Sequence, residues 1–263
     1  MTAWKPFAAV RQGIVVFLVL LLATNLRDMA AWAGFPIPGL PLPAYAGSSM
    51  DNLLLVVVAV FAVLLWPSRA AAQGLVQRLG LGACGWRGPL LVLLSTVPFW
   101  VSSALTGTVH KAIDWQGLLF TALLFPFAEE LAFRGFGFVF PFLGLRWPRW
   151  YAVLLQAACF GLYHWWGLRG SDEALIVFAL TFLGGVVFAV LDALNRYTIW
   201  SGLLFHISLN AAWGVFDMST ASGGWGMVSN AMRLVSAGLA VALLWRLARS
   251  STSTYVRRAT GWS

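Results

Sequence analysis

Long apolar runs bounded by polar or basic residues dominate the chain and predict membrane-spanning helices. A span needs about 20 apolar residues, because a helix rises 1.5 Å per residue and the hydrocarbon core is about 30 Å thick. The runs that meet this length lie at residues 12–32, 49–66, 89–106, 115–140, 149–168, 174–194, 198–216 and 229–248. Their apolar positions are continuous and do not alternate, so they predict helices and exclude the strands of a membrane barrel. The expected fold is an all-α polytopic membrane protein with about eight transmembrane helices.

The positive charges predict how these helices are oriented. With the N-terminus inside, the inside segments hold the basic residues Lys5, Arg11, Arg69, Arg78, Arg87, Arg146, Arg149, Arg196, Arg246, Arg249, Arg257 and Arg258. The outside segments and their flanks hold only Arg27, Lys111, Arg169 and Arg233, and Arg134 lies within a span. Because cytoplasmic loops are enriched in Lys and Arg, both termini are expected in the cytoplasm. Residues 34–48, which contain four prolines, are expected to form an extended outside connection.

Composition supports a membrane protein and narrows the function. The chain is 60% hydrophobic and 10% charged, which cannot cover a water-facing surface. Its net charge of +8 resides at the ends of spans, where orientation and anionic lipid explain it better than nucleic acid. The two cysteines, Cys84 and Cys159, exclude a disulfide framework and are expected to be buried small residues. We expect one membrane domain over residues 1–263 that ends in a polar, basic tail at 250–263.

Charged side chains inside the span at 115–140 are the first candidates for chemistry. Glu129, Glu130 and Arg134 stand in an otherwise apolar helix, where each is costly to place. Glu130 and Arg134 are four residues apart and can pair on one helix face. Glu129 lies about 100° around the helix from Glu130, so both carboxylates cannot use Arg134 equally. Pro126 is expected to loosen the helix just before the pair.

Two of the three histidines also fall within spans. His164 ends an apolar run, and His206 shares a helix face with Asn210, four residues later. The third, His110, is expected in a solvated outside loop. Structural explanations stay open for each group: Glu130 and Arg134 could be only an ion pair between spans, and Asn210 could only join helices.

One further polar residue and one pair of glycines are expected to have structural roles. Asp192, near a span end, is interpreted as a capping or interfacial residue, and Gly184 with Gly185 as a close-packing site.

These residue types suit hydrolysis of a peptide bond. A buried glutamate has a raised pKa and becomes a better general base, and a neutral histidine can share the proton of the attacking water. An Asn amide and a second His can donate to the oxyanion that develops in the tetrahedral intermediate. Glu129, His164 and His206 could instead bind zinc as a His₂Glu set. The residues alone do not separate these two mechanisms.

At these positions the chain resembles the CPBP family, the intramembrane CAAX-processing and bacteriocin-processing proteases. Three motifs occur in the family's order: Glu129-Glu130-x-x-x-Arg134, Phe160-x-x-x-His164 and His206-x-x-x-Asn210. The resemblance covers residues 115–215, which it marks as the catalytic core. It implies that Glu129 activates water with help from His164, that His206 and Asn210 form the oxyanion hole, and that Glu130, Arg134 and Phe160 support them.

The resemblance implies an intramembrane endopeptidase of the glutamic type, without a cofactor, and zinc is the alternative. Its partners would be the bilayer and a membrane-anchored substrate: a lipidated C-terminal tail, a sorting-signal helix, as for a myxosortase-like protease, or a leader peptide. The expected location is a bacterial inner membrane. Two other functions stay open: a non-enzymatic immunity or scaffold protein of the same family, and a proton-coupled transporter.

Overall fold

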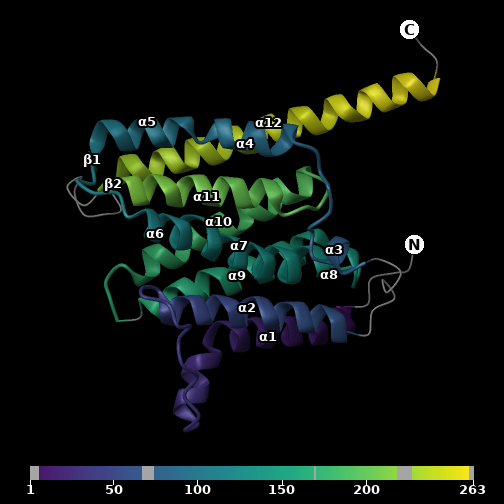
Figure 1. Ribbon diagram of the computed structural model, residues 1–263. Coiled ribbons are helices and arrows are strands. Elements are labelled where there is room, and N and C mark those ends of the chain that lie inside the picture. Colours follow the sequence, from purple (N-terminus) through teal and green to yellow (C-terminus); the bar gives the residue numbers. More distant parts are fainter. Residues whose placement is uncertain (1–5, 67–73, 169, 218–226, 261–263) are drawn as a thin grey trace. The chain divides into compact units, whose positions relative to one another are not determined.

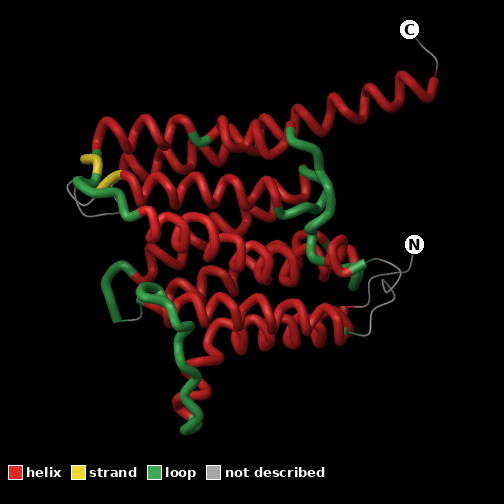
Figure 2. The backbone as a smooth tube through the Cα atoms, viewed as in Figure 1, coloured by secondary structure: helices red, strands yellow, loops and turns green. Residues whose placement is uncertain are grey.

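Helices make up most of the described backbone (Figures 1 and 2). The computed structural model describes residues 6–66, 74–168, 170–217 and 227–260. Lys5, Arg69 and Arg169 of the predicted charge pattern lie outside these residues.

The helix bounds confirm an all-α polytopic membrane protein. Within the described residues, the helices long and apolar enough to cross a membrane are Phe7–Trp32, Ala46–Leu65, Arg87–Thr106, Trp115–Leu143, Ala174–Leu194 and Val228–Ser250. The other two predicted spans are also helical, as α9 (Arg149–Gly167) and α11 (Trp200–Val215), although α11 has only 16 residues. The last helix, α12 (Met227–Thr260), continues through most of the predicted basic tail.

The first of two compact units comprises residues 1–82 and 124–189. Its elements are α1 (Pro6–Trp32), α2 (Ala46–Leu65), α3 (Leu75–Arg78), α7 (Phe125–Glu129), the π-helix η3 (Glu130–Val139), α8 (Phe140–Leu143), α9 and most of α10 (Ala174–Leu194). Within this unit η3 packs between α2 and α9, and every residue of η3 is buried. The segment with Glu130 and Arg134 is therefore the core of the unit.

Small residues let backbones approach closely in this unit. A Cβ on Gly135 would lie 2.8 Å from the carbonyl oxygen of Leu79, and one on Gly185 would lie 3.0 Å from the Cα of Ala157. Gln156 of α9 is fully buried and donates to the carbonyls of Val153 and Gly185, at 3.0 and 2.8 Å. The predicted close-packing role of the Gly184-Gly185 pair is thus confirmed at Gly185, and α9 and α10 are joined almost backbone to backbone.

Arg78 closes one end of the first unit. Its guanidinium donates to the carbonyl of Val63 near the end of α2, at 2.5 Å, and lies 5.1 Å from the ring centroid of Phe140. The side chain is only 8% exposed, and this burial lowers the pKa of Arg78 from its ordinary value. A basic side chain satisfying the last carbonyls of a helix is a favourable cap.

The second unit comprises residues 83–123 and 190–263. It contains α4 (Arg87–Ser95), α5 (Val97–Thr106), α6 (Trp115–Gly117), most of the π-helix η2 (Leu118–Leu124), α11 and α12. The strands β1 (Thr108–Val109) and β2 (Phe216–Asp217), which the sequence analysis did not predict, pair antiparallel in it. Cys84, expected to be buried, is half-buried in the loop before α4, whereas Cys159 of the first unit is buried.

Hydrogen bonds fix α11 within the second unit. The Ser208 hydroxyl contacts the Thr96 hydroxyl at 2.8 Å and accepts from the indole N–H of Trp100 at 2.9 Å. The buried carboxylate of Asp192 accepts from the backbone N–H of Gly202 at 3.0 Å, in the first turn of α11. This confirms Asp192 as a capping residue, and it supplies a side-chain acceptor that the N-cap residue Ile199 lacks.

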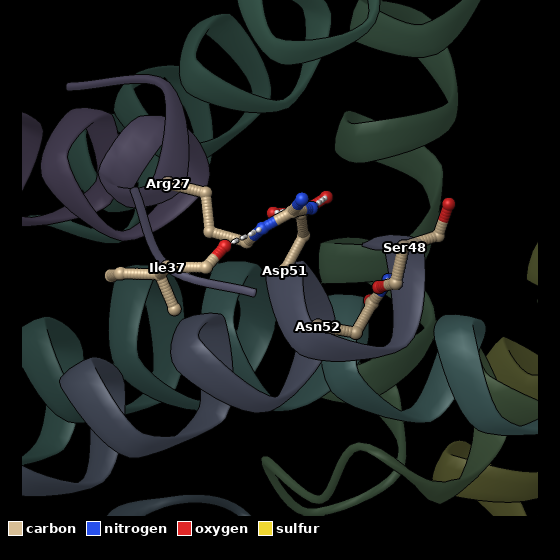
Figure 3. Close-up of polar contacts among 5 residues, drawn as sticks. All are labelled: Arg27, Ile37, Ser48, Asp51 and Asn52. Atoms are coloured by element: carbon tan, nitrogen blue, oxygen red, sulfur yellow. Dashed lines mark hydrogen bonds and ion pairs between the residues drawn. The ribbon is translucent and has the colours of Figure 1, made fainter. Parts of the chain in front are cut away.

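An ion pair joins α1 to α2, and the same arginine also bonds to the connection between these two helices (Figure 3). The Arg27 guanidinium lies 3.0 Å from both carboxylate oxygens of Asp51, and its Nε donates to the carbonyl of Ile37 at 3.2 Å. Asn52 donates to the carbonyl of Ser48 at 2.9 Å in the first turns of α2. At the end of the connection, the Tyr45 ring packs edge-on against Phe125 of α7, at 6.2 Å. The proline-rich segment is therefore held against the helix that leads to Glu129.

Replacing Arg27 with alanine should lower stability by about 1 kcal/mol. The side chains of the pair are 27% and 41% exposed, and ion pairs in such places contribute roughly 0–1 kcal/mol. Thermal unfolding in a mild detergent measures the change. Asp51→Asn, which keeps the shape of the side chain, should lose a similar amount. A loss several times larger for Arg27→Ala would show that the bond to Ile37 contributes more than the ion pair.

Candidate functional site

Glu130 and Arg134 form an ion pair in the core of the first unit. The Arg134 Nε lies 3.3 Å from a carboxylate oxygen of Glu130, and both side chains are fully buried. The predicted pairing across four residues is thus confirmed. Taking both charges out of water is costly, so the pair persists only because other groups compensate.

Two aromatic rings flank the buried guanidinium. The Cζ of Arg134 lies 4.1 Å from the ring centroid of Phe160 and 4.5 Å from that of Phe188. Both rings are themselves buried. Cation–π contacts to desolvated rings contribute about 2 kcal/mol each, which offsets part of the desolvation cost of Arg134. Phe160 was predicted as a supporting residue, and its ring contacts the guanidinium of Arg134.

Sequence reasoning missed Phe188. It lies on α10 within a uniformly apolar run, and nothing in that run distinguishes one ring from another. The Phe188 ring reaches Arg134 because α10 packs closely against α9. Gly185, three residues before Phe188, contacts Ala157 of α9 directly.

Replacing Phe188 with leucine should destabilise the protein by about 2–3 kcal/mol, because it removes one cation–π contact and part of a buried ring. Phe136→Leu is the matched control, since the Phe136 ring is equally buried but stacks on Phe140 and not on a cation. Thermal unfolding of both variants measures the difference. Equal losses would mean that Phe188 contributes only volume.

Glu129 differs from Glu130 in exposure. Glu129 ends α7 and is half-buried, whereas Glu130 begins η3 and is fully buried. Two adjacent carboxylates thus have separate environments, as the helix geometry predicts: Glu130 pairs with the arginine and is fully buried, whereas Glu129 is only half-buried.

His164 is oriented by its own helix. One ring nitrogen, Nδ1, lies 2.9 Å from the carbonyl oxygen of Phe160, one turn earlier, and because a carbonyl only accepts, Nδ1 carries the proton. In the neutral imidazole the Nε2 then carries the lone pair and is the basic atom. The rings of Phe160 and Tyr163 pack edge-on against the imidazole, at 4.5 and 5.1 Å.

His206 and Asn210 lie on α11 in the second unit. His206 is 8% exposed, and Asn210 is half-buried. The Asn210 amide donates to the carbonyl of Thr121 in η2 at 2.9 Å. Asn210 therefore joins α11 to η2. The second N–H of its amide can donate to another acceptor.

The candidate residues thus form two groups. Glu129, Glu130, Arg134, Phe160 and His164 belong to the first unit, and His206 and Asn210 belong to the second. Across the described ranges, no three His, Cys, Asp or Glu side chains are grouped so that they could hold a metal ion. His110 is exposed in the β1 loop, as predicted.

The apolar spanning helices define an integral membrane protein, with charged side chains and a histidine within its helices. Residues 111–212 match the family described as type II CAAX prenyl endopeptidase Rce1-like, so this segment is an Rce1-like domain of the CPBP family. The match includes all three motifs, from Glu129 to Asn210. An Rce1-like domain implies a CAAX-type intramembrane endopeptidase. No curated protein sequence matches the chain significantly.

Proposed function

We propose that the protein is an intramembrane endopeptidase in which the Glu129 carboxylate activates water. The observation that carries this proposal is the contrast between adjacent carboxylates: Glu130 is neutralised by Arg134 in the core, and Glu129 is half-buried on the neighbouring face. A half-buried carboxylate can reach water and act as a general base toward it. The Rce1-like domain supports the reaction class.

The proposed reaction is the addition of water to a peptide bond. Glu129 removes a proton from water as the hydroxide adds to the carbonyl carbon, and the basic Nε2 of His164 shares that proton. His206 and the second N–H of Asn210 donate to the oxyanion of the tetrahedral intermediate. When the C–N bond breaks, Glu129 or His164 returns the proton to the leaving amine. Water is consumed, and a carboxyl group and an amine are formed.

The proposed substrate is a membrane-anchored protein or peptide in a bacterial inner membrane: a lipidated C-terminal tail, a sorting-signal helix or a leader. The spanning helices support this substrate class, because a site within them is reached most readily by a chain already attached to the bilayer.

Cleavage in proteoliposomes tests the proposal. The full chain is reconstituted with anchored peptides of the three forms in water enriched in ¹⁸O, and products are identified by mass spectrometry. Cleavage with one ¹⁸O at the new carboxyl terminus, lost in Glu129→Gln, is the expected result. Equal cleavage by that variant contradicts the role of Glu129. Binding of a peptide without cleavage would instead favour a scaffold or immunity protein, and proton flux without cleavage would favour a transporter.

The proposed mechanism needs no metal ion. Elemental analysis of the purified protein and cleavage after treatment with a chelator test this separately. Full activity in protein without zinc is the expected result. Activity that is lost with the metal and restored by zinc alone would establish the metal-dependent alternative.

A further inference from the structure

A groove in the first unit is separate from the residues proposed for catalysis. This α1–α9 groove has a volume of about 210 Å³. It is lined by five residues of α1 between Phe17 and Asn25, by Phe133 of η3, and by five residues of α9 between Cys159 and Trp166.

The walls of the groove offer a ligand almost no polar group. The Thr24 hydroxyl is bonded to the carbonyl of Leu20 at 2.9 Å, and the Asn25 amide donates to the carbonyl of Leu21, also at 2.9 Å. The polar side chains of α1 in the groove are thus turned to their own helix, and the remaining walls are mainly aliphatic and aromatic, with the Tyr163 hydroxyl and the Cys159 thiol among them. The groove suits an apolar ligand.

The rim of the groove opens at an exposed surface of these two helices. Leu21, Leu162 and Trp166 line it and are 44%, 38% and 46% exposed. An apolar cavity of about 150 Å³ stays free of water and binds a molecule as large as benzene. Because α1 spans the membrane, the apolar molecules that meet this rim are lipid chains.

We propose that the α1–α9 groove binds an acyl chain of a bilayer phospholipid. The chain would pack at the inner wall against Phe133 and Tyr163, whose ring centroids are 5.9 Å apart. These rings also contact two of the candidate site residues, since Phe133 packs on Phe160 at 5.0 Å and Tyr163 on His164 at 5.1 Å. A bound acyl chain would therefore pack against the two rings, Phe133 and Tyr163, that in turn contact Phe160 and His164.

Photolabelling of the full chain in phospholipid vesicles tests this directly. The probe is a phosphatidylcholine with a diazirine on one acyl chain, and the labelled residues are mapped by mass spectrometry. Label should concentrate on residues 17–25 and 159–166. Leu21→Trp and Leu162→Trp, which fill the groove, should reduce it severalfold.

Matched controls lie on the same helices. Leu18 and Leu154 are 53% and 46% exposed but do not line the groove, so Leu18→Trp and Leu154→Trp add the same bulk on the same lipid-facing helices. These controls should leave the label unchanged. Equal labelling of residues outside the groove, or unchanged labelling in both filled variants, would overturn the proposal. Displacement of the label by an anchored peptide would show that the groove belongs to the substrate. No cleavage activity is needed, so this test is independent of the proposed function.

Discussion

Replacing Arg134 with methionine should destabilise the protein by about 3–5 kcal/mol, because it leaves the Glu130 carboxylate buried without its cation. Both side chains are fully buried, and the rings of Phe160 and Phe188 are placed for a cation and not for a carboxylate. A negative charge beside ring faces is also unfavourable, since the faces carry negative quadrupole density. Reversible unfolding in bicelles or mixed micelles measures the loss.

The double variant Glu130→Met with Arg134→Met separates pairing from packing. Replacing both members of a buried pair with apolar residues of similar volume is often neutral or stabilising. The double variant should therefore be more stable than Arg134→Met alone. If Arg134→Met were as stable as the wild type, or if the double variant were the least stable of the three, the ion pair would not be what holds this core together.

Replacing Glu129 with glutamine should lower the cleavage rate about 10²–10⁴-fold, the range that a general base contributes, with little change in stability. Glutamine keeps the shape of the side chain but cannot accept the proton of water at neutral pH. Glu129 is half-buried, whereas Glu130 forms the buried ion pair with Arg134. Replacing Glu129 should therefore affect the cleavage rate and not the stability. Cleavage and thermal unfolding are measured on the same preparations.

The matched control for Glu129→Gln is Glu173→Gln, at an exposed position beside the start of α10. That variant should cleave at the wild-type rate. Glu129→Asp should retain partial activity, because the carboxylate persists but is one methylene shorter. If Glu129→Gln unfolded as readily as Arg134→Met, its loss of activity would reflect folding and not proton transfer.

The positions of the helices follow from the sequence because apolar length is a strong local signal. The span predicted at 174–194 coincides with α10, and the pairing of Glu130 with Arg134 required only the spacing of a helix. What the sequence could not predict depends on contacts between distant segments. The approach of Phe188 to Arg134 and the bond from Asn210 to Thr121 both arise from packing, and no periodicity marks them.

The π-helical geometry of residues 118–124 and 130–139 was also not predicted. Pro126 was expected to disturb this helix, and it lies in the first turn of α7, directly after η2. Proline removes one backbone donor, but which longer-range bonds then form depends on the surroundings of the whole helix. The sequence therefore indicated where the helix is irregular and not what form the irregularity takes.

The contact between α9 and α10 has a consequence for how this unit admits a polypeptide. With Gly185 against Ala157 and the Gln156 amide bonded to the carbonyl of Gly185, these helices cannot part without losing a buried hydrogen bond and their closest backbone contact. The seam between α1 and α9 is instead closed by side chains around a groove. Of these two seams, the one between α9 and α10 is therefore the harder for a polypeptide to open when it enters laterally from the bilayer.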